Sequence, residues 1–220
     1  MKKIKLQFAM DGAASRSIEE ALEMIRNIEE TVDILEVGTS FVLRYGMEAV
    51  TRFKEAFPEK TILADMKIMD GGYHHCAMGC EAGADIVTVL GAADRETLRS
   101  AARAAHERGK EIMVDLICVP APENLMAFCG QIGADYVCVH TGVDVQARGE
   151  GPQDGLRRLL ALQKTCNVAV AGGIDETTLE SICAMGPAVV IVGGAIHKKE
   201  NYRQAALAIR RKLDCVCKGG

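Results

Sequence analysis

The sequence predicts an α/β fold, a single (β/α)8 TIM barrel that spans residues 1–220 as one domain. Short apolar runs alternate with longer amphipathic segments along the whole chain, and no linker or change of composition interrupts them. Strict alternation of strands and helices implies parallel strands joined by crossover helices. Eight such units in 220 residues fit the compact end of the barrel size range. A doubly wound open sheet is the alternative, but it commonly uses five or six strands.

The predicted strands are nearly continuous apolar runs, which is typical of a parallel sheet covered on both faces. They comprise residues 4–10, 34–37, 61–67, 86–90, 111–116, 136–140, 167–171 and 189–192. Amphipathic helices are predicted between them. These comprise residues 17–27, 44–57, 72–81, 95–108, 123–131, 153–163, 176–185 and 201–213. Several units close with a Gly-containing turn before the next strand, as at Gly83 and Gly133.

Composition narrows the class of protein. The chain is 49% hydrophobic and 25% charged, an ordinary globular balance, and its net charge of -4 argues against a nucleic-acid partner. It has no apolar stretch of about 18 residues and no N-terminal signal core, so we expect no membrane association and a cytoplasmic location. The nine cysteines include no C-x-x-C pair. We expect them to be buried apolar side chains or incidental surface thiols.

The C-terminal ends of barrel strands carry the chemistry of this fold. Asp65 and Lys67 lie two residues apart at one such end, so strand alternation predicts that their side chains point to the same side. Asp70 follows in the loop. Buried charges are costly unless paired, whereas an acid beside an amine can move protons or stabilise negative charge. The alternative is a structural ion pair at a strand end.

Further ionisable residues end four other predicted strands. Glu36 and Asp65 end neighbouring strands and are predicted to hold a hard divalent cation, Mg²⁺ or alternatively Mn²⁺. Glu36 alone also fits a capping or ion-pair role. Asp11 and Asp115 are expected to orient Lys67 or a substrate hydroxyl. His140 is predicted to transfer a proton, although a single His at the end of an apolar strand is often structural.

Paired glycines follow the last two predicted strands, at Gly172 and Gly173 and at Gly193 and Gly194. Barrels often bind phosphate in these two loops, and glycine lets backbone N–H groups approach a ligand. We therefore predict a phosphate site there. Four remaining histidines are expected to lie on the rim or the surface. They are His74, His75, His106 and His197.

Residues 63–72 resemble the D-x-K-x-x-D signature of the orotidine 5′-phosphate decarboxylase suprafamily. Within it, five further segments resemble the 3-hexulose-6-phosphate synthase family. These are residues 84–91, 114–119, 139–147, 168–174 and 189–196. The resemblance implies a homodimeric barrel that condenses ribulose 5-phosphate with formaldehyde through an enediolate.

The resemblance also implies roles for single residues. Glu36 and Asp65 would be metal carboxylates, Lys67 would lie near the enediolate oxygen, and Asp70 would enter the partner subunit's site. His140 would be the acid/base, and the paired glycines would hold phosphate.

Three other readings remain open at this point. In the related 3-keto-L-gulonate 6-phosphate decarboxylases an Arg stands where this chain has Val143, and a Glu where it has Asp115. A ribulose 5-phosphate epimerase or isomerase would use similar enediolate chemistry. A non-catalytic sugar-phosphate-binding barrel would not need the charged residues at the strand ends.

Overall fold

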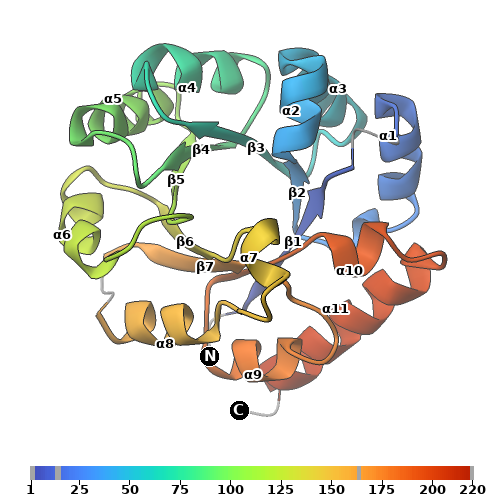
Figure 1. The fold of residues 1–220 in the computed structure, drawn as a ribbon. Helices are drawn as coiled ribbons and strands as arrows, with labels where there is room; N and C mark the ends of the chain where they lie inside the picture. The colour runs from blue at the N-terminus through green and yellow to red at the C-terminus, as the bar shows by residue number, and fades with distance from the viewer. Residues whose placement is uncertain (1–2, 13–15, 163–164, 219–220) are drawn as a thin grey trace.

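A computed structural model describes residues 3–12, 16–162 and 165–218 of the chain. Its eight parallel strands form a closed barrel in the order β1 to β8, which confirms the predicted (β/α)8 fold (Figure 1). The strands are β1 (Lys5–Met10), β2 (Ile34–Val37), β3 (Thr61–Ile68), β4 (Ile86–Leu90), β5 (Glu111–Asp115), β6 (Tyr136–His140), β7 (Asn167–Ala171) and β8 (Val189–Val192).

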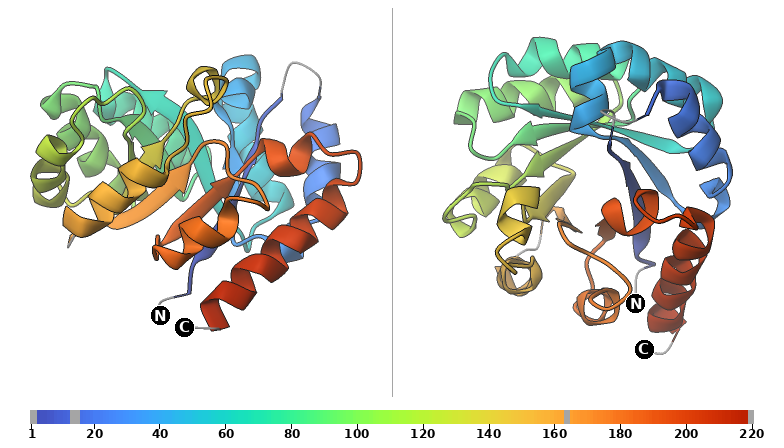
Figure 2. Two further views of the ribbon diagram at one scale, coloured as in Figure 1. Left: turned by 60° about the horizontal axis from the view of Figure 1, so that its bottom comes forward. Right: turned by 45° about the vertical axis from the view of Figure 1, so that its right-hand side comes forward.

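The longer helices form the outer ring of the barrel (Figures 1 and 2). The helices are α1 (Ile18–Arg26), the 3-10 helix η1 (Glu29–Thr31), α2 (Thr39–Tyr45), α3 (Met47–Ala56), α4 (Gly72–Glu81), α5 (Arg95–His106), α6 (Glu123–Gln131), α7 (Val143–Gln146), α8 (Gln153–Leu162), α9 (Leu179–Ala184), α10 (Gly194–His197) and α11 (Tyr202–Lys218). The short helix α7 lies inside that ring in the view of Figure 1.

The predicted helix over residues 44–57 is wrong in its first turn. The chain instead forms α2 and α3, separated by Gly46, whose φ of 62° lies in the left-handed region. Glycine adopts this conformation without strain, and it interrupts the helical hydrogen-bond ladder. The predicted helix at 176–185 is shorter, as α9, and the one at 201–213 extends into α11. Gln163, the end of another predicted helix, lies outside the described residues.

Two apolar layers hold the barrel together. Inward-facing side chains such as Leu63, Met113 and Ala169 fill its centre. Outward-facing strand residues such as Phe8 and Val114 pack against the surrounding helices. This alternation follows the two faces of each strand, and it explains why the apolar runs are continuous in the sequence. The layers leave the strand ends as the place where charged side chains meet.

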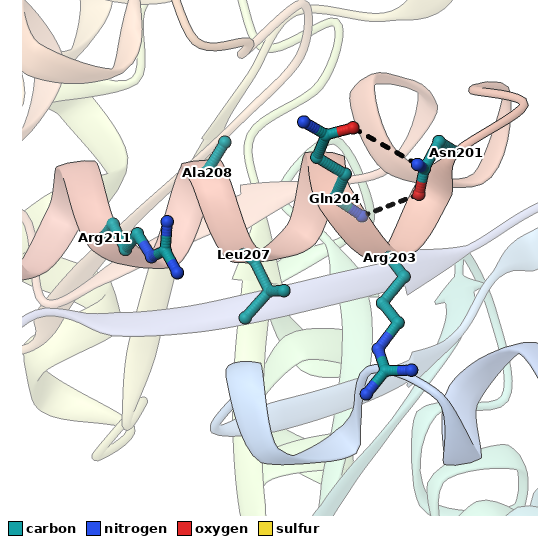
Figure 3. Close-up of a pocket in the computed structure, with 6 residues that line it drawn as sticks. All are labelled: Asn201, Arg203, Gln204, Leu207, Ala208 and Arg211. Atoms are coloured by element: carbon teal, nitrogen blue, oxygen red, sulfur yellow. Dashed lines mark hydrogen bonds between the residues drawn. The ribbon is translucent and has the colours of Figure 1, made fainter.

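The cysteines and the outer surface were also the subject of predictions. Six of the eight described cysteines are buried and all eight are free thiols, as predicted. None of the helices within the described residues has the length and apolar character needed to cross a membrane. A cytoplasmic location stays a prediction. A hollow of about 410 Å³ lies on the surface of α11, and Figure 3 shows the residues that line it. Helix α11 packs against α9 and α10 (Figure 2).

Candidate active site

Lys67 stands at the centre of the charged cluster, in an irregular part of β3. The register between β3 and β4 shifts between Ala64 and Ile68, so Lys67 lies in a bulge and not in a regular strand. Its φ is 46°, a left-handed value that costs energy for a residue with a side chain. The side chains of Asp65 and Lys67 do meet. The sequence predicted this from the alternation of side chains along a regular strand, whereas in the structure Lys67 lies in the bulge.

The Lys67 ammonium lies between two buried carboxylates. It donates a hydrogen bond to Oδ2 of Asp65, and it lies 3.5 Å from Oδ2 of Asp115. Burial by itself would lower the pKa of Lys67, but the charges of Asp65 and Asp115 raise it above the ordinary value. These two carboxylates therefore favour the charged ammonium form of Lys67, which suits electrostatic stabilisation of negative charge.

Asp115 also holds His140. The Nδ1 atom of His140 lies 2.9 Å from Oδ2 of Asp115, while the backbone N–H of Ile117 donates to Oδ1 at 2.9 Å. Burial would raise the pKa of Asp115, but His140, Lys67 and this N–H lower it. An ionised Asp115 fixes Nδ1–H of the imidazole as a donor. The other ring nitrogen, Nε2, is then the one available for proton transfer.

Two hydroxyl groups that sequence reasoning missed hold Asp65. Thr39 Oγ1 donates to Oδ2 at 2.6 Å, and Thr88 Oγ1 donates to Oδ1 at 2.8 Å. Thr88 also accepts the backbone N–H of Lys67 at 2.9 Å, so it holds the bulge as well. The signal for Thr88 was present in the sequence, because it is the polar residue of an otherwise apolar run.

Glu36 and Asp11 bring further negative charge to the same region. Glu36 is 8% exposed and accepts a 2.6 Å hydrogen bond from the amide of Gln7, another polar residue in an apolar run. Burial, followed by the charges of Asp65 and Asp11, raises the pKa of Glu36 well above its usual value. The pKa of Asp11 is raised by burial and by Asp65. The three carboxylates therefore repel one another.

This excess of carboxylate charge fits a divalent cation. Glu36 lies next to the last residue of β2, and Asp65 lies where the regular pairing of the neighbouring strand β3 stops. Both offer the oxygen ligands that Mg²⁺ prefers. Among the residues that the structure describes, no three Asp, Glu, His or Cys side chains form a metal-binding cluster. A cation held by these residues would take two carboxylates and complete its shell with water or substrate oxygens, as Mg²⁺ commonly does.

The paired glycines lie at the same end of the barrel. Gly172 follows β7 with a φ of 104°, and a Cβ atom there would lie only 2.2 Å from the carbonyl oxygen of Thr141. Gly193 and Gly194 follow β8 and begin α10. Only glycine fits the close approach at Gly172. The backbone is therefore not covered by a side chain on this side of the C-terminal end of the strands, which we call the mouth of the barrel.

Two predicted positions lie elsewhere than the cluster. Asp70 is exposed in the loop after β3, where its carboxylate accepts the N–H of Gly71 at 2.7 Å. His197 was expected on the surface, and this is wrong: it is 4% exposed. The short helix α10 turns its side chain inward, and a four-residue helix leaves no periodic signal in the sequence. His74, His75 and His106 are exposed, as predicted.

Comparison with known proteins finds relatives that match nearly the whole chain. A curated 3-hexulose-6-phosphate synthase from Bacillus subtilis is 39% identical over 210 residues, which cover 96% of this chain and 99% of the relative. The crystal structure of 3-hexulose-6-phosphate synthase from Salmonella typhimurium superposes with a TM-score of 0.93 at 41% identity, covering 97% of this chain and 100% of that one.

A related decarboxylase is more distant. The structure of 3-keto-L-gulonate-6-phosphate decarboxylase from Vibrio cholerae is 27% identical, with a TM-score of 0.83 and coverage of 98% of this chain and 99% of that one. The model of the orotidine 5′-phosphate decarboxylase / HUMPS family matches residues 5–209. The charged cluster at the strand ends, the closed barrel and these matches together show that the chain belongs to the orotidine 5′-phosphate decarboxylase / HUMPS family.

Proposed function

We propose that the protein is a metal-dependent aldolase that reversibly condenses D-ribulose 5-phosphate with formaldehyde to 3-hexulose 6-phosphate. The observation that carries this proposal is the continuous contact from Asp65 through Lys67 and Asp115 to His140. It joins a fixed cation to a proton-transfer group, as enediolate chemistry requires. The identities of 39% and 41% to named synthases, against 27% to the decarboxylase, favour the aldol reaction.

The first step transfers a proton from C1 of ribulose 5-phosphate to Nε2 of His140. The electron pair of that C–H bond becomes the C1=C2 double bond, and the π electrons of the C2 carbonyl move onto its oxygen. Lys67 stabilises the resulting negative charge, because Asp65 and Asp115 keep its ammonium group protonated and in place. No Schiff base is involved.

The second step forms the new bond. C1 of the enediolate attacks the carbon of formaldehyde, the C2 carbonyl is restored, and the formaldehyde oxygen takes up a proton. His140 is the group that moves this proton, since Asp115 fixes its Nδ1 side and stabilises the imidazolium. Asp11 lies beside the cluster and orients a substrate hydroxyl. Gly172, Gly173, Gly193 and Gly194 approach the phosphate.

Glu36 and Asp65 would hold the metal ion, Mg²⁺ or Mn²⁺. When bound, it supplies positive charge beside the substrate oxygens. The raised pKa of Glu36 supports this assignment, because a divalent cation would relieve the repulsion among Glu36, Asp65 and Asp11. Titration of Mn²⁺ followed by electron paramagnetic resonance should show one site per chain, lost in Glu36→Gln. Unchanged Mn²⁺ binding in that variant would contradict the assignment.

We further propose a homodimer in which Asp70 reaches the partner subunit's site. Asp70 and its neighbour Met69, which is 54% exposed, protrude at the mouth end of the barrel, as do Leu43 and Val143. A subunit interface would cover these apolar side chains. Heterodimers of an Asp70→Ala chain and a Lys67→Ala chain should recover part of the activity in one hybrid site. No recovery in purified heterodimers would contradict the shared site.

The activity is tested by following formaldehyde consumption with ribulose 5-phosphate and Mg²⁺, with and without EDTA. We expect consumption that needs the sugar phosphate and the metal. Release of CO₂ from 3-keto-gulonate 6-phosphate, with formaldehyde untouched, would instead identify a decarboxylase. Conversion of ribulose 5-phosphate to another sugar phosphate without formaldehyde would identify an epimerase or isomerase. Absence of all three reactions in folded protein would favour a non-catalytic sugar-phosphate-binding barrel.

A further inference from the structure

The bulge of β3 lies opposite a single residue of β4, Thr88. The strand pairing on either side of the bulge joins Ala64 to Val87 and Ile68 to Val89. Residues 65–67 of β3 therefore stand against Thr88 alone. In a regular parallel pair the inter-strand hydrogen bonds are evenly spaced, so a bulge interrupts them. Thr88 is thus placed to supply the contacts that the regular ladder lacks here.

The hydroxyl of Thr88 contacts both functional residues of the bulge. Thr88 is 3% exposed, and it lies on the same face of β4 as Ile86, whose side chain helps to fill the barrel centre. Its Oγ1 atom accepts the backbone N–H of Lys67 at 2.9 Å and donates to Oδ1 of Asp65 at 2.8 Å. An N–H can only donate and a carboxylate oxygen can only accept, so the direction of both bonds is fixed. A methyl group in the same place could make neither.

These contacts close a ring on Lys67. The ring runs from the backbone N–H of Lys67 through the Thr88 hydroxyl to Asp65, and it returns from Asp65 to the Lys67 ammonium. One residue is therefore held both at its backbone and at the end of its side chain. The φ of 46° at Lys67 is a conformation that a residue with a side chain keeps only where its surroundings hold it. The bond to Thr88 is one such hold.

Thr39 holds Asp65 in a different way. Its Oγ1 atom donates to Oδ2 at 2.6 Å, the same oxygen that accepts the bond from the Lys67 ammonium. This contact fixes the carboxylate, whereas the bond from the backbone N–H of Lys67 goes to Thr88. A comparison of the two threonines therefore separates the position of the carboxylate from the geometry of the bulge.

We propose that Thr88 is a positioning residue of the reaction, which sets the place of the Lys67 ammonium relative to the enediolate oxygen. It acts through Lys67 and Asp65, and this inference rests on the proposed function in naming the enediolate. Electrostatic stabilisation needs the cation in place before the negative charge develops. Because a small displacement of such a group costs a large factor in rate, loss of the hydroxyl should lower kcat more than it weakens substrate binding.

Thr88→Val tests this, because it removes the hydroxyl and keeps the shape of the side chain. At saturating Mg²⁺ we expect kcat of the aldol reaction to fall about a hundredfold, with the KM for ribulose 5-phosphate within about threefold of wild type. Thr88→Ser restores the hydroxyl and should return kcat to within about fivefold of wild type. A threonine that only supported the fold would change stability and leave kcat of the folded enzyme unchanged.

Thr31→Val is the matched control. Thr31 is 8% exposed and its hydroxyl donates to the carbonyl of Ile28 at 2.6 Å, before the start of β2 and so away from the mouth. The substitution removes a buried hydroxyl of the same kind, and kcat should stay at the wild-type value. A loss in Thr31→Val as large as in Thr88→Val would overturn the inference.

Amide hydrogen exchange followed by NMR gives a readout that does not depend on turnover. The N–H of Lys67 should exchange at least about tenfold faster in Thr88→Val than in the wild-type protein, because it loses its acceptor. It should exchange at the wild-type rate in Thr88→Ser and in Thr39→Val. The amide of Val137 in β6 should keep its wild-type rate in every variant, which shows that the barrel is folded.

The two readouts separate this inference from the proposed function. Wild-type kcat in Thr88→Val, unchanged exchange of the Lys67 N–H, or a loss that Thr88→Ser does not rescue would each overturn the role of Thr88, while the aldol reaction stands. If the wild-type protein has no aldol activity but exchange at Lys67 still depends on Thr88, the proposed function fails and the hold of Thr88 on Lys67 stands.

Discussion

The two ends of the barrel use the same kind of residue in opposite ways. At the N-terminal end an aspartate stands immediately before each of three strands, β2, β4 and β6. Asp33, Asp85 and Asp135 accept the backbone N–H groups of Leu6, Ile62 and Ile112, at 2.9, 3.0 and 2.9 Å. Each therefore ties its strand to the strand before it.

The carboxylates at this base are also paired with cations. Asp85 bonds Lys110 at 2.7 Å and Lys54 at 2.9 Å. Burial would raise the pKa of Asp85, but these lysines and the N–H of Ile62 lower it. The pKa of Asp33 is lowered in the same way, against the effect of burial, by the N–H of Leu6 and by Arg210.

At the mouth the carboxylates outnumber their cation. Glu36, Asp65, Asp11 and Asp115 surround Lys67, and the pKa values of Glu36 and Asp11 are raised. The base therefore gains stability from its paired carboxylates, whereas at the mouth the ionised forms of Glu36 and Asp11 cost stability. A variant that removes one charge should consequently affect stability at the base and activity at the mouth.

The largest expected effect separates two lysines that each contact aspartates. Lys67→Met should lower kcat by about a thousandfold or more, because the charge on the C2 oxygen loses its preorganised cation. Lys110→Met should leave kcat nearly unchanged and lower the free energy of unfolding by about 1 kcal/mol. Steady-state kinetics and urea unfolding of both variants check this. Comparable losses of activity in both variants would contradict the assignment of catalysis to the mouth and of stability to the base.

His140→Gln should lower kcat by about a hundredfold, because the side chain keeps a hydrogen bond to Asp115 but cannot transfer a proton. His106→Gln is the control at the base, where His106 lies 3.0 Å from Asp135. It should retain full activity. A His140→Gln enzyme with wild-type kcat would show that another group moves the proton.

Asp85→Asn should lower the free energy of unfolding by about 2 kcal/mol at pH 7, because Lys54 and Lys110 lose their counter-charge. The pKa of Asp85 is lower in the folded protein than its unfolded value of about 3.9. Its stabilisation is therefore present above about pH 4 and is lost as the pH falls through the folded pKa. The difference between wild type and variant should shrink toward pH 3. A difference that stays constant with pH would contradict the charge pairing.

Glu36→Gln should have the opposite sign, and its effect is the smallest. The pKa of Glu36 is raised above its unfolded value of about 4.3, so the wild-type protein loses stability as the pH rises from there toward the folded pKa. In EDTA the variant should be more stable at pH 7 by about 1 kcal/mol, with little difference at pH 4. Activity should fall. A less stable variant at pH 7 would show that Glu36 is already compensated.

Most strands of this fold could be predicted from the sequence, because each one is a short apolar run between turns. Runs such as residues 86–90 and 136–140 are apolar, β-branched and bounded by turns, and the structure places β4 and β6 at the same residues. The C-terminal ends of the strands in a (β/α)8 barrel lie at the same end of the barrel. That rule predicted that Glu36, Asp65, Asp115 and His140 would lie at one mouth. Roles for Asp70 and the paired glycines stay predictions.

What the sequence could not predict depends on backbone geometry. The bulge at Lys67 replaces the regular alternation, and its left-handed φ has no signature in a residue other than glycine. Helices α7 and α10 have four residues each, too few for a periodic pattern, so the burial of His197 was missed. Gly46 was visible as a glycine, but not as a break between two helices.

Hydrogen exchange at C1 of ribulose 5-phosphate in D₂O, with Mg²⁺ and no formaldehyde, shows directly whether the charged mouth forms the enediolate, and proton NMR follows it. Because enediolate formation does not need formaldehyde, the wild-type and Lys110→Met proteins should lose one C1 proton signal. Lys67→Met should leave it intact over the same time. Absence of exchange in the wild-type protein, or equal exchange in Lys67→Met, would contradict the account.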